Sequence, residues 1–161
     1  MPSQSQQLVE LKVTECFELA TTYFNRAFAY PTVLFNQRGK IAGSARLLTN
    51  EIRINPILLA DNQDDFLAEV VPHEVCHLLA HQLYGRVKPH GKEWQALMKK
   101  LFALEPHTYH KMDVTKVQGK HFAYRCQCGP TTLSIRRHNK VRRGQQQYIC
   151  RQCRTLLTAN N

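Results

Sequence analysis

Hydrophobic residues recur at helical spacing in three stretches of this chain. The first stretch runs from about residue 5 to 28, the second from about 64 to 84, and the third from 94 to 102. Apolar residues three and four positions apart lie on one face of a helix, which can then pack against a core. The pattern therefore predicts three amphipathic helices.

The second predicted helix has well-marked ends and one interruption. Residues 61–65 carry carboxylate or amide side chains, which suit a helix start, and Gly85 suits the position after a helix end. Pro72 lies inside the helix, where a proline removes one backbone hydrogen bond and clashes with the carbonyl four residues back. We expect a kink immediately before His73.

Three short segments between the first two helices favour β-strands. They cover residues 32–35, 41–46 and 52–55, and polar turn residues separate them. Together with the helices they predict an α+β domain: an N-terminal helix, a small antiparallel sheet and two further helices. A free strand edge in such a sheet could pair with an extended peptide.

His73, Glu74 and His77 form an HExxH pattern on the second predicted helix. Residues at i and i+4 lie one turn apart on the same face, so the two imidazoles can bind one zinc ion. The glutamate then lies beside the metal, where it can take a proton from a zinc-bound water and turn it into a nucleophile near neutral pH. The pattern predicts a catalytic zinc site; two ordinary helix histidines are the alternative.

A catalytic zinc ion takes three protein ligands and keeps one position open, so a third ligand must lie elsewhere. His81 continues the spacing, but it lies about 12 Å along the helix axis from His73, whereas zinc–nitrogen bonds are about 2 Å. His90 is the first candidate, because it lies in a short loop before a helix that can run back against the second. Glu93, one turn further on, is the alternative, because zinc proteases also use a downstream carboxylate.

Positive charge is concentrated in the last third of the chain. The formal net charge is +10; residues 1–110 contain eleven Lys/Arg and eleven Asp/Glu, whereas residues 111–161 contain eleven Lys/Arg and a single acid, Asp113. Such asymmetry favours a module that faces a polyanion, although a merely solvated basic tail has the same composition.

The chain shows no apolar run close to the ~20 residues that span a bilayer, and its first residues are polar, unlike a secretory signal. We therefore expect a cytoplasmic protein with no membrane partner. Six cysteines in that compartment favour metal ligands or reduced thiols over disulfides.

Four of the cysteines form two pairs near the C-terminus, and each pair follows a predicted strand, at 122–125 and 147–149. The four are Cys126, Cys128, Cys150 and Cys153. Four thiolates suit a closed tetrahedral zinc site, and a segment so poor in large apolar side chains needs one to fold. Because CxC is less usual than CxxC, His121 or His138 could replace one cysteine. Four reduced thiols without metal are the other alternative.

Five cations and no acid lie between the two cysteine pairs. They are Arg136, Arg137, Lys140, Arg142 and Arg143. Guanidinium groups match phosphate oxygens two at a time, so a loop held out by a zinc ribbon would bind a nucleic-acid backbone. Tyr124 and Tyr148 could stack on unpaired bases, but their strand positions favour packing in a core.

The segment after the third helix carries further polar side chains. His107, Tyr109 and His110 lie there. One of them could donate a hydrogen bond to the oxyanion of peptide hydrolysis, whereas polar residues of a connection between domains are the alternative.

The sequence HEVCHLLAHQLYGRVKPHGKEWQALM, residues 73–98, resembles the metal-binding core of the SprT family. These are bacterial relatives of the eukaryotic DNA–protein crosslink protease Spartan. The similarity extends to residues 42–45 and 52–59 and to the cysteine-bearing tail. It implies His73, His77 and His90 on zinc and Glu74 as general base.

The resemblance also implies a domain organisation. We expect a zincin-like metalloprotease domain at residues 1–112 and a basic zinc-ribbon-like module at 113–161. One catalytic and one structural zinc ion would be present, and a nucleic-acid-linked protease acting on protein substrates is the implied function. The alternative is a DNA- or RNA-binding regulatory protein whose HExxH site is structural or nearly inactive.

Overall fold

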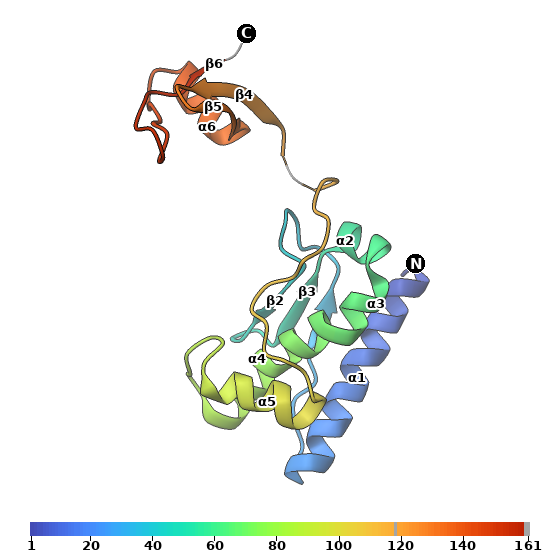
Figure 1. The fold of residues 1–161 in the computed structure, drawn as a ribbon. Helices are drawn as coiled ribbons and strands as arrows, with labels where there is room; N and C mark the ends of the chain where they lie inside the picture. Colours follow the sequence, from blue (N-terminus) through green and yellow to red (C-terminus); the bar gives the residue numbers. More distant parts are fainter. Residues whose placement is uncertain (118, 160–161) are drawn as a thin grey trace. The chain divides into compact units, whose positions relative to one another are not determined.

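The computed structural model describes residues 1–117 and 119–159 (Figure 1). Contacts within the chain divide it into two compact units, Met1–Val117 and Gln118–Asn161. The division lies five residues beyond the boundary expected from the sequence, because Val114 and Val117 still pack on the core of the first unit.

The first unit contains the helices α1 (Gln4–Phe24), α2 (Pro56–Asp61), α3 (Gln63–Asp65), α4 (Val71–Tyr84) and α5 (Lys92–Phe102), and the strands β1 (Thr32–Leu34), β2 (Gly43–Arg46) and β3 (Glu51–Ile54). The α+β class predicted from the sequence is confirmed. Helix α1 begins with a capping box between Ser3 and Gln6 and ends at Asn25, whose φ of 50° is left-handed. The short helix α2, which Asn55 caps, was not predicted.

The sheet of the first unit is mixed, so the prediction of an antiparallel sheet is wrong for one strand. The strand order is β1-β3-β2, with β2 antiparallel to β3 and β1 parallel to β3. Strand β3 enters the sheet between the two strands that precede it, since Ile52 and Ile54 are both fully buried and need the central position. Strand β2 therefore lies at an edge.

The predicted helix over 64–84 is interrupted further upstream than expected. Residues Phe66–Val70 form a π-helical turn (η1), in which the Val71 N–H donates to the Phe66 carbonyl five residues back. The wider turn places Pro72 in the first turn of α4, a position that tolerates proline. A π-turn before His73 thus replaces the predicted kink.

Helix α4 is the central element of the first unit. It packs against α1, α5, η1 and β2 (Figure 1). Val71, Val75, Leu78 and Leu79 of α4 are almost completely buried, so most of its circumference is covered. Residues on the remaining side face the edge strand β2. No helix in the described residues has the length and apolar character needed to cross a membrane.

The second unit consists of β4 (His121–Cys126), β5 (Gly129–Ser134), α6 (Ile135–Arg142) and β6 (Thr158–Ala159), with sheet order β5-β4-β6. Only Tyr124 and Leu133 are buried hydrophobic residues in its described part. The predicted strand at 147–149 is wrong except for an isolated bridge from Ile149 to Leu156. The basic segment, predicted as a loop, is the helix α6, which Ser134 caps through the Arg137 N–H.

Candidate metal centres

The Nε2 atoms of three histidines converge on one point. They are 3.2 Å apart for His73 and His77, 3.1 Å for His77 and His90, and 3.2 Å for His73 and His90. A tetrahedral zinc ion with bonds of about 2.0 Å would hold its nitrogen ligands about 3.3 Å apart. Three nitrogens cannot satisfy one another by hydrogen bonding in a triangle, so the arrangement fits a shared metal ion.

A turn with a left-handed residue brings His90 to the other two histidines. His90 has a φ of 58°, and the Gly91 N–H donates to the Lys88 carbonyl at 3.0 Å. A side chain at Gly91 would place its Cβ 2.9 Å from the Lys88 carbonyl oxygen, so the turn requires glycine there. Glu93, the alternative ligand, does not belong to the group of converging ligand atoms found in the described residues.

Trp94 forms the floor of this cluster, a role that the sequence did not reveal. Its indole stacks on the His77 ring with centroids 5.5 Å apart, and its Nε1–H donates to the His73 carbonyl at 3.1 Å. The side chain is 1% exposed. The single tryptophan of the chain, four residues after His90, was the only available signal.

Burial keeps the imidazoles neutral. It is the main cause that lowers the pKa of His73 to about 4 and that of His77 to about 3. The neighbouring His90 contributes to both shifts, and His73 contributes to that of His77. Burial also lowers the pKa of His90. A neutral imidazole presents the lone pair that a metal ion needs.

Glu74 lies within the cluster and is almost completely buried. Its Oε1 atom is 4.0 Å from the His73 Nε2, and burial raises the pKa of its carboxyl to about 8. Strand β2 covers it closely, since a Cβ at Gly43 would lie 3.4 Å from the Glu74 Cγ. A cation held by the three imidazoles would oppose this rise in the pKa of Glu74 and favour the ionised carboxylate.

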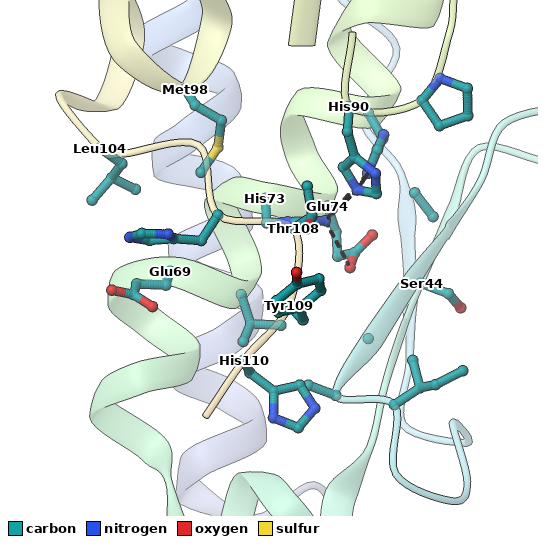
Figure 2. Close-up of a pocket in the computed structure, with 18 of the residues that line it drawn as sticks. Ser44, Glu69, His73, Glu74, His90, Met98, Leu104, Thr108, Tyr109 and His110 are labelled. Atoms are coloured by element: carbon teal, nitrogen blue, oxygen red, sulfur yellow. Dashed lines mark hydrogen bonds and ion pairs between the residues drawn. The ribbon is translucent and has the colours of Figure 1, made fainter. Parts of the chain in front are cut away.

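A cavity of about 760 Å³ opens beside the cluster. Its walls are the strand segment 40–45, the helical residues of the cluster, and residues 103–110 after α5 (Figure 2). Ser44 lies on the strand wall and Tyr109 on the opposite chain segment. Most of the lining is apolar, as is usual for a ligand-binding cleft.

The second unit gathers all four cysteines of the predicted ribbon. The Sγ atoms of Cys126 and Cys128 are 3.1 Å apart and those of Cys128 and Cys150 are 3.7 Å apart, and Cys153 belongs to the same group. Thiolates on a tetrahedral zinc ion lie about 3.8 Å apart. His138, considered as a substitute ligand, instead stacks on Phe122 with centroids 3.8 Å apart.

Two family models match consecutive parts of the chain. Residues 13–110 match the SprT-like family, and residues 120–160 match the SprT-like zinc ribbon domain. The chain belongs to the SprT-like family. Its histidine cluster and cavity lie within the first match, and its cysteine cluster lies within the second.

Curated relatives align with this chain over nearly their whole length. Protein SprT of Shewanella oneidensis is 52% identical over 95% of this chain and 97% of its own. Protein SprT of Vibrio atlanticus is 50% identical over 94% and 92%, and that of Pasteurella multocida is 48% identical over 92% and 90%. No solved structure matches the chain.

The five basic side chains that the sequence predicts as nucleic-acid contacts do not all lie on the same side of this SprT-like chain's α6. Arg136, Lys140 and Arg143 follow one another at helical spacing and share one side of α6 and its C-cap. Arg137 instead lies over the Tyr148 ring, 5.4 Å from its centroid. Tyr124 is buried, and its hydroxyl bonds to the His138 Nδ1 at 2.8 Å, which supports the core role over base stacking.

Proposed function

We propose that this chain is a zinc-dependent endopeptidase that cleaves proteins associated with nucleic acid. The observation that carries the proposal is the convergence of three imidazole nitrogens beside a buried carboxylate, at a cavity bounded by a free strand edge. Three ligands leave one tetrahedral position open for chemistry, whereas a structural site would close it.

The chain's own residues supply the proton transfers. A zinc ion held by His73, His77 and His90 would act as a Lewis acid and lower the pKa of water. The Glu74 carboxylate accepts a proton from the attacking water and then donates it to the departing amine.

The free edge of β2 supports binding of an extended peptide. Asn55 donates its backbone N–H to the Ala42 carbonyl, so Ala42 and Asn55 form a hydrogen-bonded pair of the ladder. The hydrogen-bonded pairs alternate, so the next one is Ser44 with Arg53, and the backbone groups of Gly43 and Ala45 are directed to the edge. A substrate strand would pair with these two residues, which makes recognition depend on backbone instead of side chains.

The cysteine ribbon and α6 support the nucleic-acid part of the proposal. A zinc ion on the four cysteines would hold α6 in place, and its exposed cations suit phosphate contacts. None of the six described cysteines forms a disulfide, which fits the reducing cytoplasm that we propose as the location.

The test compares two conservative variants on an unfolded or DNA-trapped protein substrate. Glu74→Gln removes the proton acceptor and should lower kcat by about 100- to 10,000-fold with zinc retained. Glu18→Gln, at an exposed position of α1, is the matched control and should hydrolyse at the wild-type rate. Undiminished hydrolysis by zinc-loaded Glu74→Gln would refute the mechanism.

A second function rests on α6 alone. The chain would be a nucleic-acid-binding regulatory protein whose histidine cluster holds metal without catalysis. Five cations in and next to a helix of eight residues favour it. Wild-type protein that binds nucleic acid, holds zinc at the histidines and cleaves no protein substrate would establish this alternative.

A further inference from the structure

Four consecutive carbonyls at the start of the strand wall each accept a hydrogen bond from another part of the chain. They belong to residues 39–42, and residues 40–42 line the cavity. Asn55 serves three of them: its Nδ2 donates to Gly39 at 2.8 Å and to Ile41 at 3.2 Å, and its backbone N–H donates to Ala42 at 2.8 Å.

Asn55 is itself held rigidly. It is completely buried, and its Oδ1 accepts from the N–H groups of Ile57 and Leu58 at the start of α2. Every hydrogen-bonding position of this side-chain amide is occupied. The segment before β2 is therefore fixed to α2 and to the core behind it.

The fourth carbonyl, that of Lys40, accepts from a different wall of the cavity. The His110 Nε2–H donates to it at 2.9 Å, and the His110 Nδ1 accepts from the Met112 N–H at 3.2 Å. A carbonyl can only accept, so these two bonds define the neutral tautomer with the proton on Nε2. Both ring nitrogens are occupied, so His110 has no hydrogen-bonding group left for an oxyanion.

His110 ends the segment that carries Thr108 and Tyr109 along the cavity (Figure 2). This segment leaves α5 after Ala103, and beyond His110 the chain returns to the core through Met112 and Val114. Among the described residues, one side-chain hydrogen bond links the two walls, and it is the bond from His110 to Lys40.

We propose that His110 is a positioning residue that fastens the 104–110 wall to the Asn55-held strand wall and so sets the width of the substrate cleft. The inference rests on the proposed peptidase function. His110 acts on catalysis only through the spacing of the two walls, so its loss should weaken binding of an extended polypeptide and leave the chemistry at Glu74 intact.

Two substitutions separate the two bonds of His110. In His110→Gln the side-chain amide can still reach the Lys40 carbonyl, but it gives up the bond from Met112. In His110→Asn the shorter side chain can accept from Met112, but it cannot reach Lys40. Only the first variant keeps the link between the walls.

The first measurement is hydrogen exchange of the backbone amides of residues 37–42 and 104–110 in the zinc-loaded full chain, which leaves out the Met112 amide because it bonds to His110 directly. We expect exchange to be roughly three- to tenfold faster in His110→Asn and near wild type in His110→Gln, in keeping with the loss of one hydrogen bond. The matched control is Lys111→Gln, whose exposed side chain has no hydrogen bond or ion pair with the described residues and should change nothing.

The second measurement is steady-state cleavage of an unfolded protein. His110→Asn should raise KM by roughly three- to tenfold with kcat, zinc content and Tm unchanged, and His110→Gln should restore KM. Equal KM and equal exchange in both variants would overturn the inference, and so would a parallel fall in kcat, zinc content and Tm. A wild-type chain that cleaves nothing would defeat the proposed function, and the exchange pattern would still decide whether His110 joins the walls.

Discussion

The two candidate metal clusters lie in units built in opposite ways. The histidine cluster is attached to a core of 23 buried hydrophobic residues, whereas the described part of the cysteine unit buries only Tyr124 and Leu133. The first unit has enough apolar burial to fold before a metal binds, and the second does not. The zinc ion that we propose for each cluster would thus serve chemistry in the first unit and folding in the second.

The geometry of the ligands follows the same division. Three neutral imidazoles face a cavity and leave a coordination position free, and four thiol groups close around a point in the ribbon. A closed site excludes substrate, and an open one exposes the metal to it. This difference between the histidine unit and the cysteine unit can be tested with three sets of substitutions.

The largest effect is expected for loss of a cysteine ligand. Cys150→Ser should unfold β4, β5 and α6, because zinc binding contributes about 10–16 kcal/mol to the folding of small zinc modules, and the first unit should stay folded. His90→Ala should leave both units folded. Amide NMR spectra of the full chain measure this, with the exposed Arg151→Ser as control. Preserved signal dispersion for the ribbon in Cys150→Ser would show that the ribbon folds without its metal.

A smaller effect is expected for the residue beneath the histidine cluster. Trp94→Phe removes the hydrogen bond to the His73 carbonyl and shrinks the ring that stacks on His77. Zinc affinity of the histidine cluster should fall by about 10- to 100-fold, as for other groups that orient metal ligands. Competition with a chelator measures it, and the ribbon zinc serves as internal control. Unchanged affinity at the histidines would contradict a positioning role for Trp94.

The smallest effect concerns the charge on α6. Replacing Arg136, Lys140 and Arg143 by Gln should reduce the slope of log K against log salt for nucleic-acid binding by about 3, since each phosphate contact contributes about 0.9. Affinity for all sequences should fall together, because α6 offers phosphate contacts and no assigned base contact.

The control for this charge variant carries the same change in the first unit. Arg86, Lys99 and Lys100 are exposed cations there, and their replacement by Gln should leave the slope unchanged. Equal slopes for the two triple variants would place the nucleic-acid contacts outside α6.

Local sequence patterns were sufficient for much of this molecule. Helix-forming periodicity predicted α1, α4 and α5, and the HExxH spacing predicted that His73 and His77 lie together. These features depend on spacing within one helix. His90 lies outside α4, and its place beside them was predicted from the short loop and from the resemblance to SprT proteins. That they hold zinc and hydrolyse peptides stays a prediction.

The features that sequence patterns missed depend on distant parts of the chain. The parallel pairing of β1 follows from the insertion of β3 between two earlier strands, which no local pattern encodes. The basic helix α6 has almost no apolar residues, so it lacks the periodic signal of a buried face. The role of Trp94 requires the return of α5 against α4, and the hydrogen bond between His110 and Lys40 joins residues 70 positions apart.

The most direct test of two separate metal centres is native mass spectrometry of the intact chain. We expect two zinc ions in the wild type, one in His90→Ala and one in Cys150→Ser. A wild-type chain with a single zinc ion would contradict two separate centres, and a His90→Ala chain that keeps both ions would contradict an open zinc site built from His73, His77 and His90.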